Sequence, residues 1–581
     1  MHEQPERTKT LIDLLAVLCL VAMTVLLVHG QLVMSPTVDE PLHIIRGVAW
    51  WTTDSTQLSF AHPPLANLIQ GLPVVLTQNV MDLTTLAGWS TANHSDMAKE
   101  MGTHHYPMLL TWIRTGRLAS GALALGLASY VYFWCRRRFD PVIALMALVF
   151  TALNPTVLAH GQVVTTDLPV SLAYMLAVGT FIDYLLPLTD KGRRWNLAWF
   201  ALGISAAITT KFTGMVLVPF FAGIGIIAAA AGLGRFRDVA LRRRLTLVIL
   251  HLALVSATCL FALNAVYRFE GVGLTVGEIL ERPEPIVYIT RSVGYNLLDQ
   301  MPIANLPDWL PLPVPYTWLF GVFMVAAQGT SGHGSWFLGQ ITDKGHWAYF
   351  PLLLLIKTPP VVLAGLCLLP ALAFFRRAGW LDMLLALAAA TLLGLLMRSQ
   401  LNIGVRHALP VVPLLSILSA RCYCEMVRLT RVPDSRWSPP MIAVTAALML
   451  TVPAAAVYNA GHHLSWFSVG PDLGYQVSIV GEDWGQDVSA LAELVHEEDL
   501  QPLYFARYGA SGLGELRIRG IHARQHRCKT NPDRLRGWLA VHRSQFVRYK
   551  DCFRLGERKP HYIVEHHIYV FKVGPQAKPK R

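Results

Sequence analysis

Long apolar runs recur along this sequence, and they constrain its fold more than any other feature. About 18 or more apolar residues in succession can cross the hydrocarbon core of a bilayer as a helix. Such runs occur at residues 11–34, 111–134, 141–159, 167–188, 196–212, 214–233, 245–267, 347–375, 380–398, 406–427 and 441–458. Because a bilayer offers no water to backbone polar groups, these runs must be helical. The sequence therefore predicts an α-helical polytopic membrane protein with about 11 transmembrane helices.

The composition agrees with this class and argues against a nucleic-acid-binding protein. Only 15% of the 581 residues are charged, against about 25% in soluble proteins, and the mean hydropathy is +0.41. The net charge of +12 is explained by the Lys and Arg residues that membrane proteins collect in cytoplasmic loops. No soluble segment carries a basic stripe with interleaved aromatic residues, as a nucleic-acid partner would require.

The basic loops also predict the orientation. Every second connection between the runs is basic, beginning with Arg136, Arg137 and Arg138 after the second run. Under the positive-inside rule this places the N-terminus in the cytoplasm and the C-terminus outside. The first run is too long for a signal peptide and is expected to stay as an anchor.

Three segments then fall outside the membrane. Two are loops, at about residues 35–110 and 268–346, within a transmembrane domain spanning residues 1–458. The third is residues 459–581, expected to form a small α/β external domain. Its strand-like pieces are Pro502–Tyr508 and Tyr562–Val573, and a helical stretch covers Val488–His496.

The histidines and cysteines of this last segment give weaker signals. His566 and His567 fall in a strand-like piece, where neighbouring side chains point to opposite faces, which argues against one shared metal. Cys528 and Cys552 could pair as a disulfide if the domain lies outside the cytoplasm; the sequence leaves this open.

Ionisable residues gather at the predicted external ends of the apolar runs. Charge at membrane depth is costly and usually functional. Lys357 is expected about 16 Å along a helix from His346, with Pro359 and Pro360 breaking the helix just beyond it. The residues are Asp39, Glu40, His62, Asp167, Lys211, His346, Lys357, Arg406 and His407.

This mixture of positive and negative side chains is typical of a group-transfer site at the level of the lipid headgroups. Cationic side chains can hold an anionic phosphate. A carboxylate can deprotonate an acceptor hydroxyl, and the cations can stabilise a departing phosphate.

The ordered set of motifs resembles the GT-C superfamily of membrane glycosyltransferases over nearly the whole chain. The branch it looks most like holds the protein O-mannosyltransferases and the aminoarabinose transferases that modify lipid A. The motifs are Asp39-Glu40, His62-Pro63-Pro64-Leu65, Asn154-Pro155 with Thr165-Thr166-Asp167, Thr210-Lys211-Phe212-Thr213-Gly214, Lys357-Thr358-Pro359, Arg406-His407-Ala408-Leu409-Pro410 and Asp483-Trp484-Gly485-Gln486-Asp487.

The resemblance implies an inverting transfer from a polyprenyl-phosphate sugar donor to a hydroxyl acceptor, in a bacterial plasma membrane. Asp39 would be the general base, with Glu40 supporting it or binding substrate. The implied substrate-binding residues are His62, Asp167, Lys211, Lys357, Arg406 and His407, of which Lys211, Lys357 and Arg406 are the candidates for the donor phosphate. The mannosyltransferases usually continue His-Pro-Pro with Gly-Lys, whereas this chain has Leu65-Ala66-Asn67, which weakens assignment to that group.

Several alternatives stay open. A divalent metal could be bound by some of Asp39, Glu40, His62, Asp167 and His346, although no ligand spacing demands one. Asp39 and Glu40 could merely cap a helix. The acceptor could be a protein, a lipid or a polysaccharide, and the sugar is not indicated. The rival class is a secondary transporter or flippase for a lipid-linked or anionic substrate, whose charges should lie near the bilayer midplane.

Overall fold

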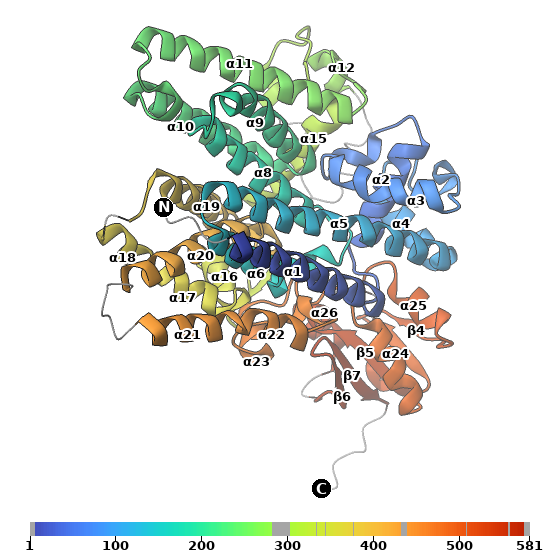
Figure 1. The fold of residues 1–581 in the computed structure, drawn as a ribbon. Coiled ribbons are helices and arrows are strands. Elements are labelled where there is room, and N and C mark those ends of the chain that lie inside the picture. Colours follow the sequence, from blue (N-terminus) through green and yellow to red (C-terminus); the bar gives the residue numbers. More distant parts are fainter. Residues whose placement is uncertain are drawn as a thin grey trace.

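The fold is mostly helical, with a small sheet at one end of a helical bundle (Figure 1). This computed structural model describes residues 6–281, 302–332, 334–342, 344–375, 377–430, 438–506, 508–555 and 558–574. Residues 282–301 of the predicted loop 268–346 lie outside the described residues. The predicted class, a polytopic α-helical protein with an α/β C-terminal region, is confirmed.

Eight long helices account for most of the predicted spans. They are α1 (Glu6–Val33), α5 (Tyr106–Arg138), α8 (Asp167–Leu185), α9 (Asp190–Thr210), α10 (Leu217–Ala231), α11 (Leu241–Val266), α19 (Trp380–Arg398) and α20 (Val411–Thr430). Among the described residues, six helices are long and apolar enough to cross a membrane, or eight if two bent pairs each count as one span. The chain is therefore a multi-pass membrane protein.

Three of the eleven predicted runs are broken rather than straight. Residues 141–159 form α6 (Pro141–Ala152) and α7 (Pro155–Gly161), bent by 58°, because Asn154 caps a new helix at Pro155. Residues 347–375 bend by 115° at Pro359 and Pro360, which cannot donate to the helix ladder. The pieces of the run 347–375 are α16 (Tyr349–Lys357), α17 (Pro360–Cys367) and α18 (Leu369–Phe374). The third broken run, 441–458, forms α21 (Ser438–Met449) and α22 (Thr451–Tyr458).

The first predicted external loop folds into short helices that pack beside α5. They are α2 (Glu40–Thr52), α3 (Leu65–Thr77) and α4 (His94–His104). Helices α2 and α3 cross at Gly47 and Gly71, where an added Cβ would stand 2.2–2.5 Å from the facing backbone. This close crossing fixes α2 relative to α3. It thereby fixes Asp39, which directly precedes α2, relative to His62, which lies shortly before α3.

The second predicted loop is only partly described. It contains α12 (Val276–Leu280), α15 (Tyr316–Ser331) and an antiparallel hairpin of β1 (Ser335–Phe337) and β2 (Gln340–Thr342). Helix α15 packs in the same apolar cluster as α2 and α4, so the two external loops form one layer.

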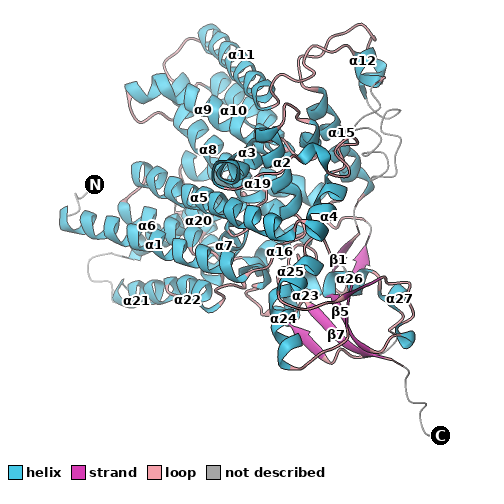
Figure 2. Ribbon diagram, turned by 90° about the vertical axis from the view of Figure 1, so that its right-hand side faces the viewer, coloured by secondary structure: helices cyan, strands magenta, loops and turns pink. Residues whose placement is uncertain are grey.

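The C-terminal region is a five-stranded sheet in the order β4-β3-β5-β7-β6 (Figure 2). Strand β3 is parallel to β4 and β5, and β7 is antiparallel to β5 and β6. The elements are α23 (Pro471–Val477), α24 (Val488–Glu497), β3 (Leu503–Ala506), α25 (Gly512–Ile518), β4 (Arg524–His526), β5 (Gly537–His542), α26 (Arg543–Arg548), α27 (Lys550–Phe553), β6 (Tyr562–Val564) and β7 (Ile568–Val573).

Two details of this region go beyond the sequence prediction. The strand-like piece Tyr562–Val573 is a hairpin, not one strand, because Glu565 and His566 adopt positive φ and turn the chain. His567 is the last residue of this turn, and the expectation that it alternates along a strand with His566 is wrong. Cys528 and Cys552 form a disulfide, a bond that persists in oxidising compartments outside the cytoplasm.

Ion pairs gather at both ends of the bundle. At one end they join Arg136 to Asp13, Arg138 to Asp183 and Arg428 to Asp140. Helix α18 and the start of α21 lie on this side, on the left of Figure 1, and the C-terminal sheet lies on the other. The alternating basic connections thus correspond to one end of the bundle. That this end is cytoplasmic stays a prediction.

Candidate active site

Glu40 is a buried anchor for the loop that carries Asp39. Its carboxylate is fully buried and accepts two hydrogen bonds from Arg117, at 2.7 and 2.8 Å, in a bidentate pair. The backbone N–H groups of Val164 and Thr37 donate to the same oxygens at 3.0 and 2.8 Å. Four donors fill the acceptor sites of this carboxylate, so Glu40 holds the loop beside Asp39 in place, and its expected catalytic role stays a prediction.

Asp39, its neighbour in sequence, is instead partly exposed. Its side chain retains 24% of its accessible surface and accepts a 2.6 Å hydrogen bond from Nη1 of Arg406. Asp39 stands at the N-cap of α2, but its side chain makes no capping hydrogen bond. The helix-cap alternative therefore does not account for this carboxylate.

A second ion pair lies beside the first. Asp167, in the first turn of α8, accepts a 2.6 Å hydrogen bond from Nζ of Lys211, which lies in the turn after α9. Both side chains are buried. Asp167 also interacts electrostatically with Arg406 and His407, so the two pairs belong to one charged cluster.

Two neutral imidazoles complete this cluster. The ring of His62 stacks on that of His43, with centroids 5.3 Å apart. Loss of water around the partly buried His62 lowers its pKa well below the ordinary value, and the nearby His43, Arg46 and Lys211 lower it further. Burial, with Arg46 adding to it, likewise lowers the pKa of His43 to about 3. Both rings are neutral at pH 7 and can exchange hydrogen bonds with an uncharged substrate group.

Lys357 ends α16 just before Pro359 and Pro360, where the sequence predicts the helix to break. Its ammonium donates to the carbonyl of Leu464 at 2.8 Å and lies 3.9 Å from Glu482. The ring of Phe467 is 4.0 Å away. Lys357 is thus enclosed by residues that follow the bundle in sequence.

His346 lies apart from the charged cluster. Its exposed ring contacts Phe337 and Trp347. Within the described ranges, no group of three or more His, Cys, Asp or Glu side chains is arranged to hold a metal ion. Asp39, Glu40 and Asp167 each pair with a cation. The candidate ligands therefore do not fit a common metal site.

An apolar cavity of about 450 Å³ lies between helices of which α8 begins at Asp167 and α9 ends just before Lys211. It is lined by α8, α9, α10 and α11 and reaches Trp318 of α15. Ile208 and Met215, which flank Lys211 in sequence, contribute to its wall. A cavity of this volume and lining suits a hydrocarbon chain.

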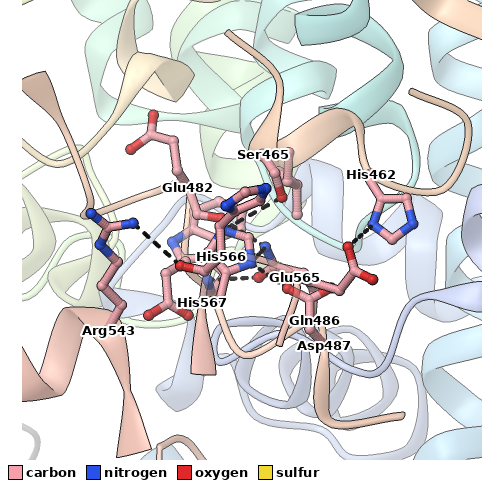
Figure 3. Close-up of polar contacts among 12 residues, drawn as sticks. His462, Ser465, Glu482, Gln486, Asp487, Arg543, Glu565, His566 and His567 are labelled. Atoms are coloured by element: carbon pink, nitrogen blue, oxygen red, sulfur yellow. Dashed lines mark hydrogen bonds and ion pairs between the residues drawn. The ribbon is translucent and has the colours of Figure 1, made fainter. Parts of the chain in front are cut away.

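The C-terminal motif at residues 483–487 contributes to the site. Trp484 presents its ring to Arg406, whose guanidinium carbon lies 4.6 Å from the ring centroid. Next to it, Asp487 pairs with the buried His567, which also bonds to Tyr475 (Figure 3). The His567 ring lies in the interior, consistent with the structural role expected for these histidines.

Sequence reasoning missed Arg117 and His43, although both carry a signal. Arg117 is a charged residue inside the second apolar run, and such residues are rare unless they have a partner. His43 lies four residues after Asp39, one turn along α2, where side chains share a face. Its Nδ1 lies 3.0 Å from the side-chain amide of Asn67.

The pair of His567 and Asp487 predicts a pH dependence of stability. Burial alone would lower the pKa of His567, but Asp487 and, further off, Asp483 raise it above its ordinary value. Arg543 opposes this rise, and Glu482 and Tyr475 also face the ring. The imidazolium is thus favoured in the folded state.

This stabilisation is complete below the unfolded pKa of about 6.5 and is lost as pH rises through the raised folded pKa. We expect the unfolding temperature of the wild type to exceed that of a His567→Gln variant most at about pH 6 and progressively less toward pH 9. Thermal unfolding of the purified proteins across that range measures this difference. A difference that stays constant with pH would show that folding does not raise the pKa of this ring.

Comparison with known proteins gives matches among solved structures alone. No protein-family model and no curated protein matches the chain. Apo ArnT from Cupriavidus metallidurans is 14% identical with a TM-score of 0.47, covering 98% of this chain and 100% of that one. The same protein bound to undecaprenyl phosphate is 13% identical with a TM-score of 0.46, covering 98% and 99%.

An Archaeoglobus fulgidus oligosaccharyltransferase tethered to an acceptor peptide is 11% identical with a TM-score of 0.45, covering 93% of this chain and 70% of that one. Because these TM-scores are below 0.5, the similarity identifies neither the substrates nor the catalytic residues of this chain. The solved structures similar to this chain thus include an aminoarabinose transferase, from the group that its motifs resemble.

Proposed function

We propose that this protein is an inverting glycosyltransferase that moves a sugar from a polyprenyl-phosphate donor to a hydroxyl acceptor. The observation that carries the proposal is the cluster of Asp39, Arg406, Asp167 and Lys211. It joins a reachable carboxylate to two cations beside an apolar cavity. A base, a phosphate site and a hydrocarbon site are the three elements that such a transfer needs.

Asp39 is the proposed general base. The acceptor oxygen attacks C1 of the sugar while the bond from C1 to the phosphate oxygen breaks. The phosphate leaves with the bonding electron pair, and Asp39 takes the hydroxyl proton. Arg406 holds this carboxylate in place through the hydrogen bond from its Nη1. Glu40 cannot serve in the same way, because its oxygens are enclosed by Arg117 and backbone N–H groups.

Lys211 and Arg406 are the proposed ligands of the donor phosphate. Both cations interact with Asp167, so they can share one anion between them, and both can stabilise charge on the departing phosphate. Lys357 is the weaker candidate because Glu482 and the Leu464 carbonyl already hold it. The prenyl chain would occupy the apolar cavity, whose wall continues from the residues around Lys211.

The proposed setting is a bacterial plasma membrane, with the N-terminus cytoplasmic and the site on the periplasmic or external face. The disulfide between Cys528 and Cys552 supports an oxidising compartment for the C-terminal domain. Which sugar is carried, and whether the acceptor is a protein, a lipid or a polysaccharide, depends on the shape of the loaded site.

The test is turnover of radiolabelled polyprenyl-phosphate monosaccharides by the purified protein in lipid nanodiscs, with a membrane extract as acceptor. We expect one donor to be consumed, and Lys211→Met to lower kcat/KM about 100-fold through loss of a charge-assisted phosphate contact. Lys344→Met is the matched control, because Lys344 is exposed in the external loop, and it should retain wild-type turnover.

A wild type that consumes no donor would contradict the proposal. Transport of a lipid-linked or anionic substrate across sealed vesicles would then be the next measurement. If Lys211→Met and Lys344→Met lose turnover equally, the phosphate site is misplaced.

A further inference from the structure

One segment of the C-terminal region, residues 481–487, contacts Arg406 and the loop that leads into Asp39. We infer that Trp484 in this segment is a positioning residue, which fixes the distance between the base and the cation. The inference deepens the proposed function and rests on it. It makes the C-terminal domain part of the active site.

The contact with the Asp39 side is made by the backbone. The N–H of Val38, directly before Asp39, donates to the carbonyl of Trp484 at 2.8 Å. The N–H of Ser35 donates to the carbonyl of Gln486 at 2.9 Å. Two hydrogen bonds three residues apart along the loop fix its direction as it leads into Asp39.

The contact with the Arg406 side is made by a ring and by two glycines. The Arg406 guanidinium lies over the Trp484 ring, in a cation–π geometry, while its Nη1 donates to Asp39. The backbones of Gly404 and Gly481 touch, so that a Cβ on Gly481 would stand 2.8 Å from Cα of Gly404. Trp484 therefore meets the guanidinium group, and Gly481 meets the turn that carries it.

The segment is itself rigidly held. The N–H of Trp484 donates to Oε1 of Gln486 at 2.7 Å, and Nε2 of Gln486 donates to the carbonyl of Glu482 at 2.7 Å. Asp487 pairs with His567 (Figure 3), and Asp483 lies 3.0 Å from Nδ1 of His542. Since His542 ends β5 and His567 precedes β7, the central strands of the sheet anchor the segment.

This arrangement has a direct consequence for catalysis. Asp39 and Arg406 are far apart in sequence, and each lies on a short loop or turn beside the bundle. A displacement of about 1 Å between reacting groups can cost about 100-fold in rate. Trp484 bonds to Val38 beside Asp39 through its carbonyl and faces Arg406 with its ring. Its side chain is 2% exposed, so it can set that distance without contacting the sugar or acceptor.

The first experiment compares Trp484→Ala with Trp484→Phe. We expect the alanine variant to lower kcat about 100-fold, with a smaller change in the donor KM. Phenylalanine keeps an aromatic face for Arg406 and should restore most of kcat. Trp309→Ala is the control, because Trp309 is 73% exposed in an external loop, and it should behave as wild type.

Hydrogen exchange provides a second readout that needs no turnover. In Trp484→Ala, the amides of Ser35 and Val38, which donate to the segment, should exchange about tenfold faster, as expected when one hydrogen bond is weakened. The amides of β5 should keep their protection, which shows that the domain still folds. If the wild type turns over no donor, the proposed function fails while this measurement still decides the positioning role.

A glycine pair gives a matched test of the same contact. Gly481→Ala should repeat both effects, because its Cβ would push the Arg406 turn away. Gly470→Ala is the control, since Gly470 has a similar positive φ of +81° and nothing within 4 Å of an added Cβ. Unchanged kcat and unchanged exchange in both Trp484→Ala and Gly481→Ala would overturn the inference.

Discussion

Replacing Asp39 with asparagine should lower turnover about 1,000-fold, within the range that removal of a general base produces. The amide has nearly the shape of the carboxylate but cannot accept a proton at neutral pH. It still offers an oxygen to Arg406, and the side chain is partly exposed. The fold should therefore survive, and the loss should appear in kcat rather than in expression or stability.

Asp54→Asn is the matched control for this variant. Asp54 lies just after α2, and its side chain is fully exposed beside Arg268, so neutralising it should leave turnover unchanged. Sugar release from the donor that the wild type consumes measures both variants. If Asp39→Asn keeps more than about a tenth of wild-type kcat, a loss far below that expected for a base, another group accepts the proton.

Removal of Arg117 should have the largest effect on stability. Its five N–H donors serve the Glu40 carboxylate and the backbone carbonyls of Gln31, Met34 and Ser35. Arg117→Met leaves a buried carboxylate without its cation and three carbonyls without this donor. Breaking a buried pair from one side costs about 3–5 kcal/mol, so we expect the free energy of unfolding to fall by that amount.

Arg136→Met is the control for this prediction. Arg136 pairs with Asp13 at 3.4 Å, and the two side chains are 28% and 53% exposed, so its loss should cost about 0–1 kcal/mol. Denaturant unfolding of the purified proteins in detergent measures both changes. The double variant Glu40→Gln/Arg117→Met should recover part of the loss, because it no longer buries an unpaired charge. A loss as small as that of Arg136→Met would show that Arg117 does not anchor the loop.

These two predictions assign different roles to adjacent carboxylates. Asp39 and Glu40 read as one acidic pair in the sequence, and the resemblance gave both to the reaction. In the fold, α2 begins between them. Asp39 faces Arg406 at the partly open cluster, while Glu40 turns into the interior toward Arg117. Both residues are carboxylates, so the difference in their roles comes from burial: the Glu40 side chain is enclosed, and that of Asp39 is partly exposed.

Most of the helices and their order could be predicted from the sequence, as could the gathering of charged residues at one end of the bundle. Apolar runs decide this locally, since a backbone in a bilayer must bond within its own segment. The basic residues that follow alternate runs, such as Arg136 to Arg138, lie at the opposite end from Asp39 and Arg406. The prolines at 359 and 360 also marked a helix break in advance.

Which charged side chains pair with each other depends on the tertiary structure and could not be predicted from the sequence. Arg406 reaches Asp39 across 367 residues of sequence, and Arg117 reaches Glu40 across 77. Such partners depend on how helices pack and bend, which no local pattern encodes. The 115° bend that takes Lys357 to the C-terminal region and the place of Trp484 against Arg406 arise in the same way. Contacts between distant segments are set by the packing of the whole chain, whereas a helix is set by its own residues.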